Sequence, residues 1–322
     1  MKALGKTIII TGAGSGMGRE LTLQLNAKGA IVIALDIHQA PLQETIRLSS
    51  NPSTIKDYVV DVSRQEEVNA FVQNLLKEGP IDGVINNAGI IQPFVKVNEL
   101  TFAAIEKVMH VNFYGPLYLI KALLPHFLTR PEAHIVNTSS MGGFLPVPGQ
   151  AVYGASKAAL KLLTEGLYAE LKGTNVHVTA VYPGAIATNI SQNSGVQIKA
   201  SSIDASSSMS SLAADKAAAI IIDAMEKNKF RVLVGSDAKF MDFIYINDFL
   251  KILDLYVTKN NLPKIIDCVY EKKYKLSDVA HIINSLSNYV VDIHLMDEKL
   301  GFDYCGVHNN LGVEFEGLKF GI

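Results

Sequence analysis

The chain has 322 residues, of which 48% are hydrophobic and 19% charged, and its formal net charge is -2 at pH 7. This composition is typical of a soluble protein with a sizeable core and excludes an intrinsically disordered chain. The near-neutral charge gives no electrostatic reason to expect a nucleic acid or an anionic membrane as partner.

The chain begins with a short strand-like pattern. "MKALGKTIIITG" (1–12) reaches a glycine too early for a signal-peptide core. No apolar run approaches the roughly 18–20 residues of a membrane span. The two cysteines, Cys268 and Cys305, are far apart in the sequence and have no histidine at metal-ligand spacing. We therefore expect a cytoplasmic protein with reduced thiols and no metal site.

Seven short β-branched runs alternate with helical patterns over most of the chain. Each run is nearly continuous in hydrophobicity, as in strands buried on both faces. They lie at 7–12, 30–36, 57–61, 81–89, 133–140, 175–184 and 230–235. The alternation predicts an α/β fold, with a doubly wound parallel seven-stranded sheet of the Rossmann type over residues 1–240. Ligands of such sheets bind beyond the carboxyl ends of the strands.

A glycine-rich turn follows the first predicted strand. "TGAGSGMG" (11–18) places Gly12, Gly14, Gly16 and Gly18 before a helix, where glycines let the backbone approach a pyrophosphate. Such a turn can also simply ease the packing of strand on helix. Asp36 ends the second strand, where a carboxylate accepts hydrogen bonds from ribose hydroxyls and repels a 2′-phosphate. The pattern favours NAD over NADP, with a plain turn residue as the alternative for Asp36.

A tyrosine and a lysine stand four residues apart in "AVYGASKAALKLL" (151–163). On a helix, Tyr153 and Lys157 share one face and are one turn apart. A phenol with a pKa of about 10 is a poor base at neutral pH. A neighbouring ammonium, together with the positive nicotinamide ring of NAD, favours the phenolate and lowers that pKa. The spacing predicts a general acid–base pair, and the alternative is a solvated helix face.

With these stretches, residues 1–240 resemble the short-chain dehydrogenase/reductase family in its single-domain branch. The matching motifs stand in the family's order: "TGAGSGMG" (11–18), "DV" (61–62), "NNAG" (86–89), "VN" (111–112), "SSMGG" (139–143), "YGASK" (153–157) and "PGAIAT" (183–188). The resemblance implies four catalytic residues, which are Asn112, Ser140, Tyr153 and Lys157. The family's usual spacing to the tyrosine favours Ser140, and Ser139 stays as the second candidate.

The resemblance also implies what these residues do. Tyr153 exchanges a proton with an alcohol or ketone, Ser140 bonds the same substrate oxygen, Lys157 holds the nicotinamide ribose, and Asn112 holds a water. The implied cofactor-binding residues are Gly12, Ser15, Gly16, Met17, Gly18, Asp36, Asp61, Val62, Asn86, Ala88, Gly89, Tyr153, Lys157, Pro183, Gly184 and Thr188. The strand-end residues of this set can instead be turn residues, Asn86 above all.

Two later segments differ in composition from the rest. Residues 191–213 are rich in Ser, Asn and Gly, which favours a lid over the cleft, with a passive loop as the alternative. Residues 241–322 predict a small α/β lobe. There "DFIYINDFLKIL" (242–253), "KYKLSDVAHIINSLSNYVVDI" (273–293) and "LGFDYCG" (300–306) resemble the carboxyl lobe of extended-branch epimerases and dehydratases. The chain thus resembles a splice of two relatives.

The leading hypothesis is an NAD-dependent oxidoreductase that transfers a hydride between NAD and a secondary alcohol or ketone. A nucleotide-sugar epimerase or dehydratase is the alternative that the tail supports. A catalytically silent NAD-sensing module is a third reading, from another class of protein. The family resemblance further implies a homodimer or homotetramer, built through helices at 101–128 and 153–172.

Overall fold

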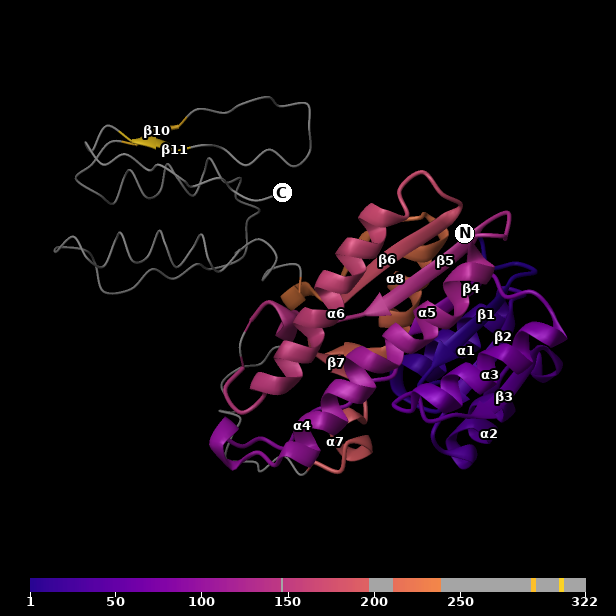
Figure 1. Ribbon diagram of the computed structural model, residues 1–322, viewed down its shortest axis with the longest axis horizontal. Helices are drawn as coiled ribbons and strands as arrows, with labels where there is room; N and C mark the ends of the chain where they lie inside the picture. Colours follow the sequence, from indigo (N-terminus) through magenta and orange to yellow (C-terminus); the bar gives the residue numbers. More distant parts are fainter. Residues whose placement is uncertain (146, 197–210, 239–290, 294–306, 310–322) are drawn as a thin grey trace. The chain divides into compact units, whose positions relative to one another are not determined.

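Seven parallel strands form one sheet in the computed structural model (Figure 1), in the order β3-β2-β1-β4-β5-β6-β9. Their bounds are β1 Thr7–Thr11, β2 Ile31–Asp36, β3 Ile55–Val59, β4 Gly83–Asn86, β5 Ala133–Thr138, β6 Val176–Pro183 and β9 Arg231–Val234. The order reverses between β1 and β4, so the sheet is doubly wound with its switch point there. The predicted fold class and all seven strands are confirmed, although β3 begins two residues earlier than expected.

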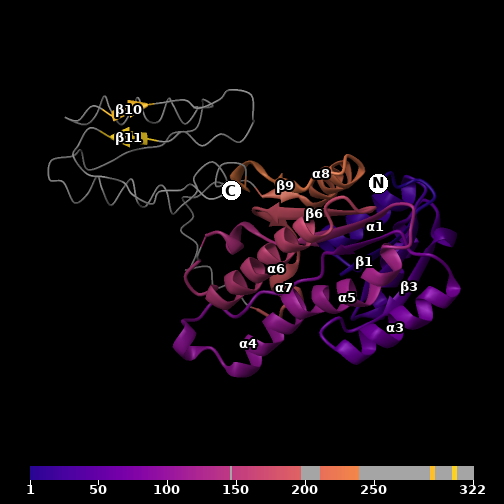
Figure 2. The same ribbon diagram turned by 45° about the horizontal axis from the view of Figure 1, so that its top comes forward.

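Helices cover both faces of the sheet, which gives three layers (Figures 1 and 2). One face carries α1 (Gly16–Ala27), α2 (Gln39–Leu48) and α8 (Ala214–Glu226). The other carries α3 (Gln65–Glu78), α5 (Gly115–Phe127) and α6 (Ala151–Glu170). A short helix, α4 (Phe102–Met109), continues through a π-helical turn, His110–Tyr114, into α5.

Shorter elements lie in the connections. Three 3-10 turns span Pro52–Thr54, Val97–Glu99 and Met141–Gly143. After β6, the two-residue strand β7 (Ile186–Ala187) pairs in parallel with β8 (Leu212–Ala213), and α7 (Ile190–Asn193) follows β7.

Side-chain alternation along the strands divides the core between the two faces. In β1, Ile8 and Ile10 pack with Leu21 of α1 and Ile221 of α8. Ile9, between them, belongs to the cluster on the opposite face. All three β1 isoleucines are fully buried. A central parallel strand covered by helices on both faces therefore has no polar side, which is why the strand runs are so continuously apolar.

The structure describes residues 1–145, 147–196, 211–238, 291–293 and 307–309. The chain divides into two units, Met1–Ile246 and Asn247–Ile322. In the second, β10 (Val291–Ile293) pairs antiparallel with β11 (Val307–Asn309). The rest of the expected 241–322 lobe, its boundary at residue 240, both cysteines and residues 197–210 of the expected lid lie outside the described residues. The resemblance of the tail to extended-branch enzymes therefore stays a prediction.

Within the described part of the chain, no helix combines the length and apolar character that crossing a membrane requires. The same residues contain no group of three His, Cys, Asp or Glu side chains that could hold a metal ion.

Candidate active site

Three segments bring the four expected catalytic residues together at the carboxyl end of β5. Asn112 lies in the π-helical turn, Ser140 follows β5, and Tyr153 and Lys157 lie in the first half of α6. The segments are tied by hydrogen bonds: Lys157 Nζ donates to the carbonyl of Thr138 at 2.9 Å, and Asn112 Nδ2 donates to Ser156 Oγ at 3.0 Å. The predicted residues thus form one site.

Ser140 and Tyr153 meet across a tight turn. Ser140 Oγ hydrogen-bonds the Tyr153 side chain and accepts from the amide of Gly142 at 3.0 Å. A Cβ at Gly142 would lie 3.2 Å from Tyr153 Cε1, and a Cβ at Gly154 would lie 2.8 Å from the carbonyl oxygen of Gly142. The glycines of "SMGG" and "YGASK" therefore let the turn sit directly on α6, which places the serine hydroxyl at the phenol.

Ser139 has a different environment from its neighbour. Its side chain is buried, and its hydroxyl donates to the backbone carbonyl of Lys157 at 2.8 Å. This bond joins the end of β5 to α6 and engages the hydroxyl's only proton. The geometry therefore favours Ser140 over Ser139 as the residue that bonds a substrate oxygen.

Lys157 is an almost fully buried ammonium. Burial lowers its pKa from 10.5 to about 8, and its Nζ donates to the carbonyl of Thr138. Gly89 lies beside it, because a Cβ there would be 3.2 Å from Lys157 Nζ and 3.4 Å from Asn112 Oδ1. The missing side chain of Gly89 leaves room above this cation.

In the protein alone, burial raises the pKa of Tyr153 above its usual value, and the opposing influence is the hydrogen bond with Ser140 rather than the charge of Lys157. The expected lowering of this pKa therefore depends on the second charge that it assumes, the positive ring of a bound nicotinamide.

The side chain of Asn112 is committed within the fold. Its Oδ1 accepts from the amide of Ile90 at 2.9 Å, and its Nδ2 donates to the carbonyl of Ile90 at 2.9 Å and to Ser156 Oγ. A water at this residue would have to use the backbone of the π-helical turn.

The glycine-rich turn forms a close contact between β1, α1 and the "NNAG" segment. Gly12 has a φ of 67°, in the left-handed region that favours glycine. A Cβ at Gly18 would lie only 1.9 Å from the carbonyl oxygen of Gly12. α1 starts at Gly16 with no acidic residue in its first turn, and among the described residues its N-cap, Ser15, makes no side-chain capping bond. Such an end suits an anion.

Asp36 stands beside this turn. Its Oδ2 accepts from the amide of Gly14 at 3.0 Å and its Oδ1 from the amide of His38 at 3.1 Å. Arg19, which sequence reasoning did not single out, holds the same turn from α1: its Nη2 donates to the carbonyl of Gly14 at 2.7 Å and its Nε to Thr45 Oγ1 at 3.1 Å. The carboxylate is thus fixed at the end of β2.

Residues after β6 lie against the glycine-rich turn. A Cβ at Gly16 would lie 3.2 Å from the side chain of Thr188. Asn193 Nδ2 in α7 donates to Ser15 Oγ at 2.8 Å. Gly184 packs on Asp237, whose carboxylate accepts from the amide of Ala185 at 2.5 Å. Pro183, Gly184 and Thr188 therefore lead the chain from the sheet toward the predicted cofactor site.

Some of the remaining predicted cofactor residues lie near the glycine-rich turn, and others follow β3. Ala88 lies on the turn side, because its amide donates to Thr11 Oγ1 at 2.9 Å and a Cβ at Gly12 would touch it. Met17 packs against the core beneath the turn. Asp61, beside buried Val62, accepts from the hydroxyl and amide of Ser63.

Asn86 belongs to the interior of the sheet. It is buried, and its Nδ2 donates to Asn137 Oδ1 of the neighbouring strand β5 at 2.8 Å. Asn137 Nδ2 continues the network to Thr164 Oγ1 in α6 at 2.9 Å. The Nδ2 of Asn86 therefore has a structural partner, whereas its Oδ1 has no hydrogen-bond partner within the described chain.

Two residues that sequence reasoning missed organise the site. Thr11 Oγ1 accepts from the amides of Asn87 and Ala88, which fixes "NNAG" against the glycine-rich turn. Gln92 is fully buried, and its Oε1 accepts from the amides of Val152 and Tyr153. The sequence could have indicated Thr11, because it ends a predicted strand next to the glycines. No pattern in the residues around Gln92 indicates its role.

The residues present fit a nicotinamide dinucleotide. The glycine-rich turn lacks the Cβ atoms that would fill it, and the cation of Lys157 lies beside Gly89. Two buried oxygens next to these groups, Asn87 Oδ1 and Thr138 Oγ1, have no hydrogen-bond partner within the described chain. A polar ligand or water would satisfy them.

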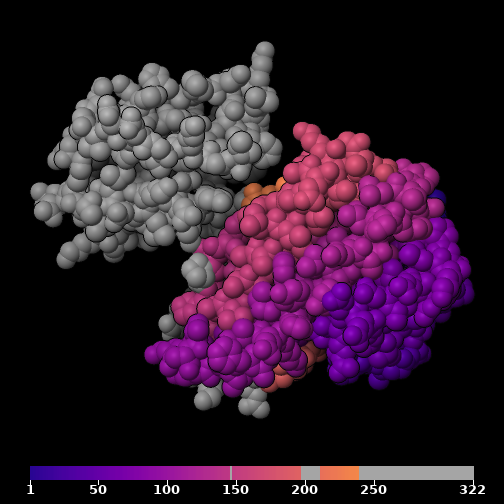
Figure 3. All heavy atoms as spheres, in the orientation of Figure 1, coloured from indigo at the N-terminus to yellow at the C-terminus, as the bar shows by residue number. Residues whose placement is uncertain are grey.

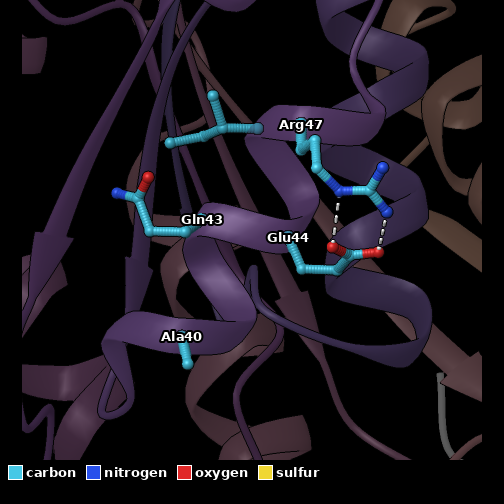
Figure 4. A pocket seen from close by; sticks show the side chains of 5 residues that line it. Ala40, Gln43, Glu44 and Arg47 are labelled. Atoms are coloured by element: carbon cyan, nitrogen blue, oxygen red, sulfur yellow. Dashed lines mark hydrogen bonds and ion pairs between the residues drawn. The ribbon is translucent and has the colours of Figure 1, made fainter.

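A hollow at α2 contains none of the predicted site residues in its lining (Figure 4). It is lined by Ala40, Gln43, Glu44, Ile46 and Arg47. Arg47 and Glu44 form a two-pronged ion pair, with Nη2 to Oε1 at 2.7 Å and Nε to Oε2 at 2.9 Å. The charges of the hollow are therefore matched to each other, and we assign it no role in the site.

Comparison with known proteins gives consistent matches. The model of the short chain dehydrogenase family matches residues 6–199. The putative oxidoreductase SadH of Mycobacterium tuberculosis is 36% identical over 250 residues, which are 74% of this chain and 90% of that protein. A short-chain dehydrogenase/reductase from Burkholderia phymatum, solved in complex with NAD, matches with a TM-score of 0.68 and 25% identity over 83% of this chain and 99% of that chain. A short-chain dehydrogenase from Burkholderia cenocepacia, solved in complex with NADP, matches with a TM-score of 0.65 and 26% identity over 79% and 98%.

Proposed function

The chain belongs to the short-chain dehydrogenase family of oxidoreductases, and from that premise we propose that it transfers a hydride between NAD and a secondary alcohol or ketone. The observation that carries the proposal is the convergence of Ser140, Tyr153 and Lys157. The phenol is hydrogen-bonded to Ser140, and the buried ammonium lies one helical turn further along α6. A hydroxyl, a phenol and a cation in one site suit proton exchange with an alcohol.

Each protein residue has one task in the oxidation of an alcohol. Ser140 donates a hydrogen bond to the substrate oxygen, and Tyr153, as phenolate, takes the hydroxyl proton. A bound nicotinamide dinucleotide supplies the two-electron acceptor for the hydride of the carbinol carbon. In the direction of reduction, Tyr153 returns the proton to the carbonyl oxygen.

The charge state of Tyr153 depends on its surroundings. Burial raises the pKa of the phenol, so the protein alone favours the neutral form. An oxidised nicotinamide ring carries the further positive charge that the phenolate needs. Lys157 assists as a cation held at the carbonyl of Thr138, from which it can also reach ribose hydroxyls. The water relay proposed at Asn112 uses the backbone, because the side chain is occupied by Ile90 and Ser156.

NAD is the cofactor that the end of β2 supports. The Asp36 carboxylate lies beside the Gly14 amide, where it can accept from ribose hydroxyls and would repel a 2′-phosphate. The relatives solved with NAD and with NADP show that the fold accommodates both. The proposed contacts are the turn residues Gly12, Ser15, Gly16, Met17 and Gly18, with Asp61, Val62, Asn86, Ala88, Gly89, Pro183, Gly184 and Thr188.

The protein is also proposed to self-associate through α4, α5 and α6. α4 lies at the surface of the described unit (Figure 3), and Phe102 at its start is 81% exposed. Leu162 on α6 is 69% exposed. Large apolar side chains this exposed favour burial against another chain. Light scattering that shows a monomer would contradict a homodimer or homotetramer.

The test replaces the phenol without removing the ring. Tyr153→Phe is expected to lower kcat with NAD and a panel of secondary alcohols by about 10²–10⁴-fold, with NADH binding retained. Tyr168→Phe is the matched control, because Tyr168 lies on the same helix but stacks on Phe230. Unchanged turnover in Tyr153→Phe would refute the mechanism.

Two alternatives remain distinguishable by ligand. A nucleotide-sugar that raises the melting temperature where simple alcohols do not would favour an epimerase or dehydratase, because a ligand stabilises the state that it binds. Binding of NADH without turnover of any alcohol or ketone would favour a silent NAD-sensing module.

A further inference from the structure

Gln92 is a buried amide with every polar atom of its side chain engaged. Its Nε2 donates to the carbonyl of Gly149 at 2.9 Å. Its Oε1 accepts from the amide of Val152 at 2.8 Å and from the amide of Tyr153 at 3.0 Å. The side chain is fully buried. One residue therefore contacts both the segment that enters α6 and the backbone of the residue that bears the phenol.

These contacts replace an ordinary helix cap. The first N–H groups of a helix have no acceptor within the helix, and a Ser, Thr, Asp or Asn side chain at the N-cap normally supplies one. In α6 the N-cap is Gln150, whose side chain makes no capping bond in the described structure. Instead its Nε2 donates to the carbonyl of Gln92 at 2.7 Å. The first turn of α6 is thus held by a residue about 60 positions earlier.

The segment that contains Gln92 also holds other parts of the site. The amide and carbonyl of Ile90 bond the side chain of Asn112. The amide of Ile91 donates to Ser194 Oγ, next to α7, at 3.0 Å. Residues 90–92, which follow "NNAG", therefore connect the π-helical turn, the segment after β6 and the start of α6.

From these contacts we propose that Gln92 is a positioning residue for Tyr153. It fixes the first turn of α6, and with it the phenol, relative to Ser140. Proton transfer requires the two partners within hydrogen-bond reach, so a small displacement of this turn lowers the rate even when the cofactor and substrate still bind. The inference rests on the proposed function, because it assumes that Tyr153 exchanges the proton.

Three variants separate positioning from simple stabilisation. Gln92→Met keeps the length and apolar stem but removes every hydrogen bond of the amide. Gln92→Glu keeps an acceptor oxygen for the two amides, at a helix N-terminus that favours a carboxylate, and loses only the donor to the carbonyl of Gly149. Asn26→Leu is the matched control, because Asn26 is also a buried amide, and its side chain bonds Asn51 and Thr54 outside the site.

The first readout is kinetic, with the best secondary alcohol of the panel and NAD. Gln92→Met is expected to lose about tenfold or more in kcat, with the KM for alcohol and the Kd for NADH within about threefold of wild type. Gln92→Glu is expected to recover part of the kcat, and Asn26→Leu to keep it despite a lower melting temperature. Equal kcat in Gln92→Met and Asn26→Leu, or equal losses in Gln92→Met and Gln92→Glu, would overturn the proposal.

The second readout needs no turnover. Hydrogen–deuterium exchange of the Val152 and Tyr153 amides in the cofactor-free protein is expected to speed up in Gln92→Met and not in Asn26→Leu. Unchanged exchange in Gln92→Met would also overturn the proposal. If Gln92→Met does not fold, Gln92→Asn takes its place in the kinetic and the exchange experiments, because asparagine is one methylene shorter and withdraws the amide from its partners. A wild-type protein that turns over no alcohol or ketone would refute the proposed function instead. The failure of the proposed function can therefore be told apart from the failure of the role proposed for Gln92.

Discussion

The hydroxyl of Ser139 donates a hydrogen bond to the backbone carbonyl of Lys157, 2.8 Å away, while the hydroxyl of its neighbour Ser140 bonds the phenol of Tyr153. Two adjacent serines at the end of β5 thus contact the same helix in different ways. One joins strand and helix through the backbone, and the other enters the site.

This division predicts opposite effects of two neighbouring substitutions. Ser140→Ala is expected to lower kcat by about 10²-fold or more, because the substrate oxygen loses a donor as charge develops on it. Ser139→Ala is expected to keep kcat within several-fold and to lower the free energy of unfolding by about 1 kcal/mol, the net value of one hydrogen bond. Steady-state kinetics and urea unfolding measure the two. A larger loss of kcat in Ser139→Ala would reverse the assignment.

Cofactor choice is expected to depend on the charge of Asp36. In the wild type, NADH should bind more tightly than NADPH, because a 2′-phosphate would lie beside the carboxylate held at Gly14. Asp36→Ala is expected to reduce the ratio of the two Kd values by about tenfold, which corresponds to about 1.4 kcal/mol. Isothermal titration with each nucleotide gives the ratio.

The control for Asp36 is a second carboxylate on the neighbouring strand. Asp57→Asn removes the same charge from β3, where the side chain accepts from Gln39 and Gln43. Its Kd ratio should stay that of wild type. Equal ratios in Asp36→Ala and the wild type would show that the carboxylate does not select NAD.

The buried ammonium of Lys157 predicts a pH dependence of stability. Burial lowers its pKa from 10.5 to about 8. Between these values the unfolded chain binds the proton and the folded protein releases it, so this group raises the free energy of unfolding as pH increases. Lys157→Met lacks the contribution. Between pH 8 and 10.5, the free energy of unfolding of the wild type should therefore rise relative to that of Lys157→Met, by about 1 kcal/mol per pH unit.

Urea unfolding at several pH values from about 7 to 10.5 measures this difference. Lys161→Met serves as the control, because it removes one ammonium from the next turn of the same helix, where Nζ pairs with Glu165. Parallel curves for the wild type and Lys157→Met would show that the ammonium is not buried as the structure places it.

The fold could be predicted from the sequence because its main signals are local. The sequence of β1 is "TIIIT" because both faces of a central strand are covered. Glycines follow this strand because Gly12 and Gly18 contact each other across the turn. The spacing of Tyr153 and Lys157 likewise predicts a shared helix face. Such patterns depend on a few neighbouring residues and are visible before folding.

What the sequence could not show depends on tertiary contacts. The pairing of Asn86 with Asn137 joins two strands, and the capping of α6 by Gln92 joins segments about 60 residues apart. Neither partner can be read from its own neighbours. For the two serines at 139–140, the spacing in the family resemblance favours Ser140, but the physical reason lies in how β5 meets α6. The charge state of Tyr153 also needed the structure, since burial opposes the expected lowering of its pKa.

Two glycines in helices provide a matched pair for the glycine-rich turn. A Cβ at Gly18 in α1 would lie 1.9 Å from the carbonyl oxygen of Gly12 and 2.7 Å from Asn87 Nδ2. Gly18→Ala is therefore expected to lower the free energy of unfolding by about 1–3 kcal/mol and to weaken NADH binding, because the turn must open. At the exposed Gly166 in α6, no described atom lies within 4 Å of such a Cβ. Gly166→Ala should instead raise the free energy of unfolding by about 0.5–1 kcal/mol, since glycine is a poor helix former. Urea unfolding and NADH titration test both, and destabilisation of equal size in the two variants would refute the close contact at Gly12.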